Sequence, residues 1–170
     1  CPPPQILARA IVRSPAQLRR SWYVLFFQLP WLPERRMAAN AAEVVGRALV
    51  GGSHRREAWT REEVDAYRAA FARPGRAKAA IDWYRAGFRR SVRPRRGRAR
   101  ATVAAPTLVL WGVEDRFLGR ELVTLERLRD AFSEGNVPSV VLIEDAGHFV
   151  QNEAPERVND ELLRWLGPAA

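Results

Sequence analysis

The chain has 170 residues, 47% of them hydrophobic, and a formal net charge of +9, which together exclude an intrinsically disordered chain. The single cysteine, Cys1, excludes a disulfide-stapled scaffold and fits a reducing compartment. No apolar run reaches the length of a membrane span and no signal peptide opens the chain, so we expect a cytoplasmic protein without a membrane partner.

The first part of the chain has the pattern of a helical region. Residues 1–14 hold a proline-rich start and a short apolar run, and we interpret them as the end of an upstream part. Ser14 and Pro15 form a helix start, because a capping side chain precedes a proline in the first turn, and that helix is expected to reach Leu29. Three more helices follow, each with apolar residues at helical spacing, over 37–52, 60–75 and 76–92.

Composition changes near residue 100. Residues 1–100 hold 22 Lys and Arg against 7 Asp and Glu, whereas residues 101–170 hold 6 against 12. A basic linker with Pro and Gly, 93–106, lies at this change and predicts two structural units. A basic half can bind nucleic acid, but only one of the 28 cationic residues is lysine, which indicates arginine-rich codon usage. We therefore expect no nucleic-acid partner.

The last part of the chain has an α/β pattern. Short apolar runs bounded by turn residues predict buried strands at 106–111 and 139–144. Amphipathic segments predict helices at 119–133 and 154–167. A strand–helix–strand–helix order predicts parallel pairing of the two strands.

Two residues with catalytic chemistry follow these strands. Asp115 comes just after the first strand and His148 just after the second, so both are expected at the carboxyl edge of the sheet, where ligands bind in open α/β folds. An acid that hydrogen-bonds a histidine fixes its tautomer and lets it act as a general base. Glu114 is adjacent to Asp115 and leaves a small ambiguity about which acid is the partner.

The segments "LWGVEDRF" and "IEDAGHFVQNEAPERVN" together resemble the C-terminal end of an α/β-hydrolase. The resemblance implies an α/β fold, with parallel strands and flanking helices preceded by a helical lid. It also implies a division into a remnant of the upstream core (1–14), a lid with the basic linker (15–100) and the C-terminal part of the core (101–170). The implied catalytic pair is His148 as general base and Asp115 as the residue that orients it.

The helical part narrows the resemblance to the epoxide hydrolases. "SWYVLFFQLPWLPE" and "AAIDWYRAGFRR" resemble two lid segments that each carry one tyrosine in that family. The matching residues are Tyr23 and Tyr84, which would donate to the epoxide oxygen as the ring opens. Four aromatic residues would form an apolar wall against a small apolar epoxide: Phe27, Trp31, Trp83 and Phe149. The reaction adds water and implies no metal and no organic cofactor.

Part of the family machinery is absent from the sequence. Residues 1–170 contain no Gly-x-Asp-x-Gly or Gly-x-Ser-x-Gly elbow and no His-Gly-x-Pro oxyanion loop. We therefore expect a fragment that is inactive alone and that needs a complementary N-terminal half or forms a homo-oligomer. The alternatives are a haloalkane or haloacid dehalogenase, a serine esterase of the same fold, or an inactive truncated remnant.

Overall fold

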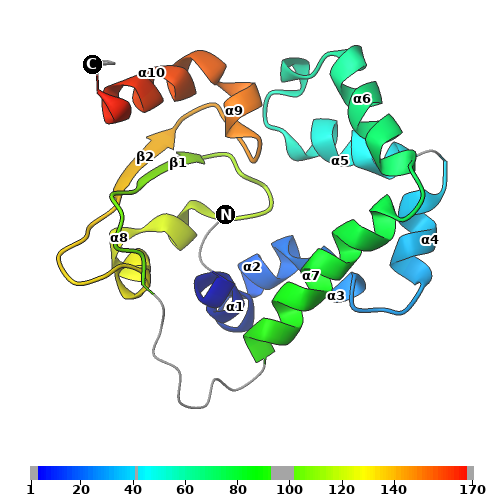
Figure 1. Cartoon of the computed structure of the whole chain (residues 1–170), viewed down its shortest axis with the longest axis horizontal. Helices are drawn as coiled ribbons and strands as arrows, with labels where there is room; N and C mark the ends of the chain where they lie inside the picture. Colours follow the sequence, from blue (N-terminus) through cyan, green and yellow to red (C-terminus); the bar gives the residue numbers. More distant parts are fainter. Residues whose placement is uncertain (1–3, 41, 93–101, 168–170) are drawn as a thin grey trace.

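The computed structural model describes residues 4–40, 42–92 and 102–167. Residues 4–92 are helical, as Figure 1 shows in blue to green. Their elements are α1 (Pro4–Arg13), α2 (Pro15–Arg20), α3 (Trp22–Phe26), α4 (Leu32–Ala38), α5 (Glu43–Gly52), the 3-10 turn η1 (Arg56–Ala58), α6 (Arg61–Ala72) and α7 (Arg76–Val92).

Two of the predicted helices of this part are wrong in their bounds. The helix expected from Pro15 to Leu29 is divided at Ser21, whose backbone N–H closes α2 on the carbonyls of Gln17 and Leu18. The helix expected over 37–52 is interrupted because Asn40 and Ala42 take left-handed backbone conformations. Its first residues belong instead to α4, which has a proline in its first turn, where no intrahelical N–H is needed.

Other expectations for the helical part are confirmed. The Thr60 side chain accepts from the backbone N–H of Glu63, whose carboxylate accepts in return from the backbone N–H of Thr60. The last helix, α7, has the predicted bounds. No helix was expected at Pro4–Arg13. Helix α1 forms there, and its Ile6 and Ala10 belong to the hydrophobic core of the α/β part. The basic linker falls mostly on residues 93–101, which lie outside the described residues.

The α/β part contains the predicted parallel pair. Strands β1 (Leu108–Gly112) and β2 (Ser139–Ile143) pair in parallel, from Leu108 opposite Ser139 to Gly112 opposite Ile143. The helix expected over 119–133 is instead three short pieces, and Thr124, which is extended, separates the first piece from the second. The remaining elements are η2 (Arg120–Val123), α8 (Leu125–Leu128), η3 (Arg129–Ala131), α9 (Val150–Glu153) and α10 (Pro155–Leu166).

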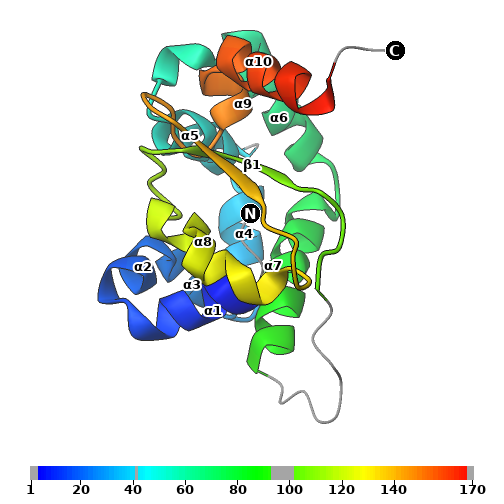
Figure 2. The same cartoon turned by 90° about the vertical axis from the view of Figure 1, so that its left-hand side faces the viewer.

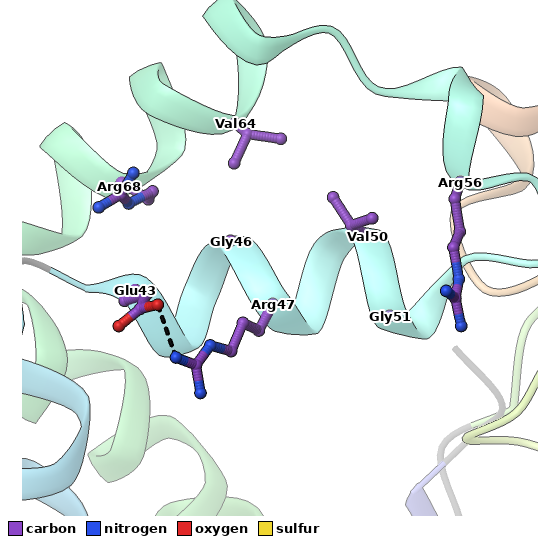
Figure 3. Close-up of a pocket in the computed structure, with 8 residues that line it drawn as sticks. All are labelled: Glu43, Gly46, Arg47, Val50, Gly51, Arg56, Val64 and Arg68. Atoms are coloured by element: carbon purple, nitrogen blue, oxygen red, sulfur yellow. Dashed lines mark hydrogen bonds and ion pairs between the residues drawn. The ribbon is translucent and has the colours of Figure 1, made fainter.

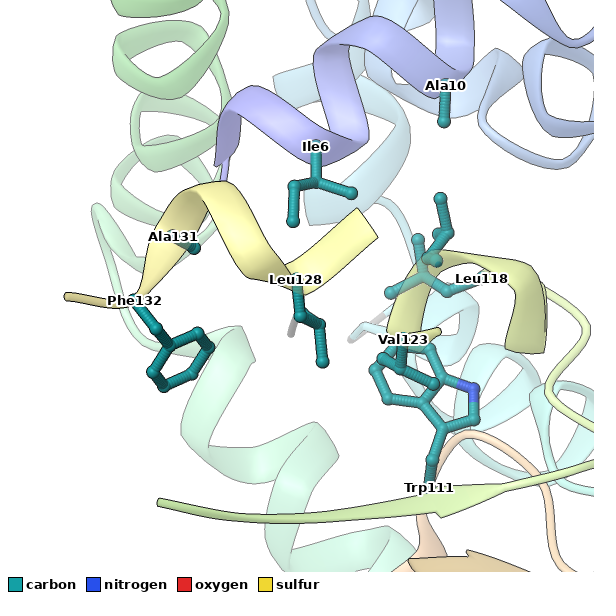
Figure 4. Packing of buried hydrophobic residues seen from close by; sticks show 9 residues of the cluster. Ile6, Ala10, Trp111, Leu118, Val123, Leu128, Ala131 and Phe132 are labelled. Atoms are coloured by element: carbon teal, nitrogen blue, oxygen red, sulfur yellow. The ribbon is translucent and has the colours of Figure 1, made fainter. Parts of the chain in front are cut away.

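The sheet is covered on both faces, as the two views of Figures 1 and 2 show. Alternate strand residues point to opposite faces. On one face, Leu110, Val141 and Ile143 pack against Val158 of α10. On the other, Trp111 lies in a larger cluster to which α1 and the short helical pieces contribute (Figure 4): Ile6, Ala10, Leu118, Leu122, Val123, Leu128, Ala131 and Phe132. This layering holds the carboxyl ends of both strands toward the helical part.

The helical part has a separate small core. Val45 and Leu49 of α5 pack with the ring of Trp59, and Phe149 of the α/β part packs against the same cluster. The indole Nε1–H of Trp59 donates to the hydroxyl of Ser53 over 2.7 Å, which satisfies the buried polar tip of this side chain. Within the three described ranges, the structure has no helix long and apolar enough to cross a membrane.

Candidate active site

Asp115 lies in the loop that follows β1, and its own loop orients the carboxylate. Oδ1 accepts the backbone N–H groups of Phe117 at 2.8 Å and Leu118 at 3.0 Å. The other oxygen, Oδ2, lies 2.9 Å from Nδ1 of His148. The side chain of Asp115 is 6% exposed, so both carboxylate oxygens are committed to these partners. Glu114, the alternative acid, is exposed to solvent.

His148 lies in the loop that follows β2. Its side chain is 33% exposed, and its ring lies between two phenylalanines. The ring of Phe117 is 4.9 Å from it and that of Phe149 is 5.1 Å from it, both edge-on. With Nδ1 on Asp115, the imidazole has Nε2 left, and no hydrogen bond to that nitrogen comes from the described residues. A neutral His148 that donates from Nδ1 therefore presents a basic Nε2.

Close approach of the two loops brings these side chains together. The backbone N–H of Glu114 donates to the carbonyl of Ala146 over 2.9 Å. A Cβ on Gly112 would lie 2.2 Å from the carbonyl oxygen of Gly147 and 2.5 Å from that of Ala146, so only glycine fits at the end of β1. Asp145 turns the second loop with a left-handed φ of 55°, a conformation that aspartate tolerates.

A chain of aromatic rings leads from His148 to the two predicted tyrosines. Phe117, which contacts His148, also contacts Tyr23 of α3 edge-on, with ring centroids 5.9 Å apart. Tyr23 and Tyr84 of α7 lie edge-to-face at 5.8 Å. The structure thus brings the two tyrosines together on the helical side of the His148–Asp115 pair. No hydrogen bond from the described chain occupies either hydroxyl.

The environment keeps both phenols neutral. Burial raises the pKa of Tyr23 above its ordinary range, and the nearby Tyr84 and the Asp115 carboxylate raise it further. Burial also raises the pKa of Tyr84. Two neutral phenols side by side are suited to donate hydrogen bonds to one oxygen atom.

The predicted apolar wall is only partly assembled. Phe27 contacts both tyrosines, with its ring 5.8 Å from that of Tyr23 and 5.0 Å from that of Tyr84. Phe149 contacts His148 and Trp59. Trp83 touches Tyr84 with its ring edge but is 68% exposed, and Trp31 is 62% exposed beneath the guanidinium of Arg35. The two tryptophans therefore lie on the surface of the described chain, contrary to the expectation of a wall. Trp31 precedes the first residue of α4 and itself has a left-handed backbone conformation, with a φ of 51°.

Two buried polar side chains that the sequence pattern missed hold the loops of Asp115 and His148. Gln17 of α2 donates from Nε2 to the carbonyl of Phe117 over 2.9 Å and accepts from the backbone N–H of Gly119 over 3.2 Å. Glu153, at the end of α9, accepts from backbone N–H groups of the His148 loop and of the segment after α5. Neither residue belongs to a sequence motif, and both bond to backbone groups of these loops, so no signal in the sequence could have identified them.

An open pocket lies away from the His148–Asp115 pair. It has a volume of about 440 Å³ and lies between α5 and α6, where Val50 and Val64 face each other and Arg56 and Arg68 are found at its two ends (Figure 3). His148 and Asp115 do not line it. We place more weight on the His148 loop as the candidate site, because the acid–histidine pair and the aromatic rings converge there. Across residues 4–40, 42–92 and 102–167, no cluster of His, Cys, Asp and Glu is suited to hold a metal ion.

Comparisons with known proteins agree with this architecture. The sequence model of the Alpha/beta hydrolase family matches residues 2–161. AB hydrolase superfamily protein YfhM of Bacillus subtilis is 30% identical over 97% of this chain and 54% of its own length. Epoxide hydrolase 4 of Homo sapiens is 31% identical over 97% of this chain and 44% of its own length. The chain thus spans about half the length of these curated relatives.

Solved structures show the same fold. The crystal structure of Bacillus megaterium epoxide hydrolase in complex with an inhibitor superposes with a TM-score of 0.74 at 21% identity, over 95% of this chain and 56% of that one. Cfl2 from Burkholderia cenocepacia superposes with a TM-score of 0.73 at 24% identity, over 89% of this chain and 49% of that one. At these identities the likeness concerns the fold.

Proposed function

The chain belongs to the alpha/beta hydrolase family, and on that premise we propose that it carries the lid and the acid–base half of an epoxide-hydrolase-like enzyme. The names of several curated relatives support this reaction class. The observation that carries the proposal is the 2.9 Å contact between Nδ1 of His148 and Oδ2 of Asp115. The neutral phenol of Tyr23 lies one ring away, across Phe117, and that of Tyr84 lies beside Tyr23. The proposed division is a core remnant (1–14), a lid (15–100) and the C-terminal core (101–170).

His148 is the proposed general base. A carboxylate nucleophile attacks an epoxide carbon and forms an ester, and water must then cleave that ester. Nε2 of His148 takes a proton from this water while the new oxygen–carbon bond forms, and Asp115 stabilises the resulting imidazolium through Nδ1–H. When the ester carbon–oxygen bond breaks, the leaving alkoxide takes the proton of the carboxyl group, which gives the diol and restores the carboxylate. The imidazolium returns its proton to the tyrosinate left by ring opening, so one epoxide and one water give one diol.

Tyr23 and Tyr84 are the proposed proton donors for ring opening. When the epoxide C–O bond breaks, negative charge builds on the ring oxygen, which is a poor leaving group unless it is hydrogen-bonded or protonated. The raised pKa of each phenol keeps its proton available at neutral pH. Phe27 and Phe149 supply apolar surface on either side of this group, which favours a small apolar epoxide. For Trp31 and Trp83 the exposure in the described chain supports a substrate contact less well.

The 170 residues contain no aspartate elbow and no oxyanion loop. The proposed reaction therefore takes its nucleophile from outside them, and the chain by itself is expected to show no turnover of epoxides. A complementary N-terminal half, or a second chain, is the proposed source.

The test uses the protein translated from the gene together with any coding sequence that precedes Cys1 in frame. A styrene-oxide-type epoxide is supplied and the protein mass is followed. We expect His148→Gln to accumulate a covalent adduct equal in mass to the epoxide, because alkylation proceeds and ester hydrolysis stops. Tyr23→Phe and Tyr84→Phe are expected to slow adduct formation, with Tyr67→Phe as the matched control in another lid helix.

Either of two results would overturn the proposal: full turnover by His148→Gln, or turnover by the isolated 170-residue chain. An adduct that forms on serine instead of aspartate would redirect it to an esterase. Release of halide from a haloalkane, with no reaction on the epoxide, would redirect it to a dehalogenase.

A further inference from the structure

Glu153 has a buried carboxylate, and all of its hydrogen-bond donors are backbone N–H groups of other residues. The residue is 1% exposed. Its Oε2 accepts the N–H groups of His54 at 2.7 Å, Arg55 at 2.9 Å and Gly147 at 3.0 Å, and its Oε1 accepts that of Phe149 at 3.1 Å. A buried carboxylate is tolerated only when hydrogen bonds satisfy it, and these four donors do so.

Two of the four donors flank His148. The amide of Gly147 precedes it and the amide of Phe149 follows it, and both point to the same carboxylate. These N–H groups belong to the peptide units 146–147 and 148–149, so the carboxylate holds the backbone on either side of the Gly147–His148 pair and restricts the direction of the His148 Cα–Cβ bond. The imidazole then has only two side-chain torsions to set, and Asp115 together with the flanking rings of Phe117 and Phe149 limits them.

The other two donors come from the helical part. His54 and Arg55 lie just after the end of α5, and the guanidinium of Arg55 also donates to the backbone carbonyl of Glu153 over 3.0 Å. A Cβ on Gly147 would lie 2.9 Å from the backbone nitrogen of His54, so the two segments are in direct contact. Glu153 thus joins the loop of His148 to a segment 99 residues earlier in the chain.

We propose that Glu153 is the positioning residue for His148: its carboxylate locks the backbone on both sides of the histidine and ties that loop to residues 54–55 of the lid. For its catalytic meaning the inference rests on the proposed function, since His148 is the base there. The geometric part does not depend on catalysis. The carboxylate is the hydrogen-bonded link between residues 54–55 and the backbone beside His148.

The test is Glu153→Gln in the 170-residue chain. Glutamine keeps the shape and one oxygen, but its NH2 group must face at least one of the four backbone donors, so at least one hydrogen bond is replaced by a donor–donor clash. The control is Glu156→Gln, the same chemical change at an exposed position in the first turn of α10. Nitrogen-15 NMR of the His148 ring is the readout, because it reports the tautomer and the exchange of the Nδ1 proton.

In the unmodified chain and in Glu156→Gln, we expect one tautomer with the proton on Nδ1. In Glu153→Gln, we expect a mixture of tautomers and exchange of the Nδ1 proton about tenfold faster, the change expected when one hydrogen bond is lost. If Glu153→Gln does not fold, Glu153→Asp replaces it, because aspartate keeps the charge but is one methylene too short to reach both segments. We expect the same changes in the His148 signals.

A purely structural role gives a different result. The free energy of unfolding would fall, while the tautomer and the Nδ1 exchange of His148 stayed as in the control, and this overturns the inference. Kinetics of the complete protein separate it from the proposed function. A loosened His148 with a lower kcat and a nearly unchanged KM supports both. A loosened His148 with unchanged turnover supports the positioning of the ring and overturns its role as base.

Discussion

The loop that carries Asp115 is held by a neutral buried side chain, Gln17, and the loop that carries His148 by a charged one, Glu153. In both, one buried polar side chain from another segment bonds to loop backbone and to nothing catalytic. Gln17 is neutral, holds the loop by a donor and an acceptor, and comes from the helical part. Glu153 is a carboxylate, offers acceptors only, and comes from the α/β part. The Asp115 loop is thus held without a second negative charge beside its carboxylate, whereas the His148 loop is held by a negatively charged side chain.

The largest change in the free energy of unfolding is expected when the Glu153 carboxylate is removed. Glu153→Ala leaves four backbone N–H groups without their acceptor, two of them in the His148 loop and two in the segment after α5. We expect the free energy of unfolding to fall by about 4 kcal/mol, because hydrogen bonds to charged groups are the stronger ones and buried donors are costly to leave unpaired. Urea unfolding followed by tryptophan fluorescence measures it. A loss no larger than that of Gln17→Ala would remove the distinction between the charged and the neutral side chain.

The neutral side chain of Gln17 is expected to contribute less to the free energy of unfolding than that of Glu153. Gln17→Ala removes bonds to the Phe117 carbonyl, the Gly119 amide and the Ser21 hydroxyl, and leaves a small buried space. We expect a loss of about 2–3 kcal/mol in the free energy of unfolding. The same urea experiment measures it, with Gln28→Ala as the control, since that amide bonds only to the carbonyl of Val24, four residues earlier. Equal losses in the two variants would contradict the role assigned to Gln17.

A smaller effect is expected one step behind Glu153. Ser53 precedes His54 and accepts from the buried Nε1–H of Trp59, while its own hydroxyl donates to the carbonyl of Leu49. Ser53→Ala leaves that indole donor unpaired and should lower the free energy of unfolding by about 1–2 kcal/mol. If the segment after α5 is held chiefly by Glu153, hydrogen exchange at the His54 amide will change little in Ser53→Ala. Exchange there as fast as in Glu153→Ala would shift the anchor to Ser53.

The smallest effect concerns the tyrosine beside the Asp115 loop and appears only at high pH. Burial, with Tyr84 and Asp115 nearby, raises the pKa of Tyr23, so the folded state favours the neutral phenol. This stabilisation is complete below the unfolded pKa of about 10 and is lost as pH rises from there through the raised folded value. As the pH rises from neutral to above about 10, we expect the free energy of unfolding to fall less in Tyr23→Phe than in the unmodified chain. Urea unfolding at neutral pH and above a pH of about 10 checks this, with Tyr67→Phe for comparison. The same pH dependence of the free energy of unfolding in Tyr23→Phe and in the unmodified chain would contradict it.

The sequence carried the parts of the site that depend on local pattern. Two apolar runs with turn residues after them predicted parallel strands and placed Asp115 and His148 at one sheet edge, and their side chains are 2.9 Å apart. Their catalytic roles stay predictions. The break in the helix at Ser21 and the left-handed backbone at Trp31 were not predictable, because they depend on how α3 and α4 pack. Gln17 and Glu153 were not either, since their partners are backbone amides far along the chain, and an amide looks the same in every residue.

The distance along the chain that these bonds bridge has a consequence for the order of folding. Gln17 and the Phe117 carbonyl are 100 residues apart, and His54 and Glu153 are 99 apart. Loops of that length close late, because the entropy lost in closing them is recovered only once both segments are structured. Helices α5 to α7 can form from local contacts, while the imidazole and its aspartate must wait for both closures. In refolding from urea, the ring signals of His148 should therefore belong to the slowest phase, after most of the helical circular dichroism has returned.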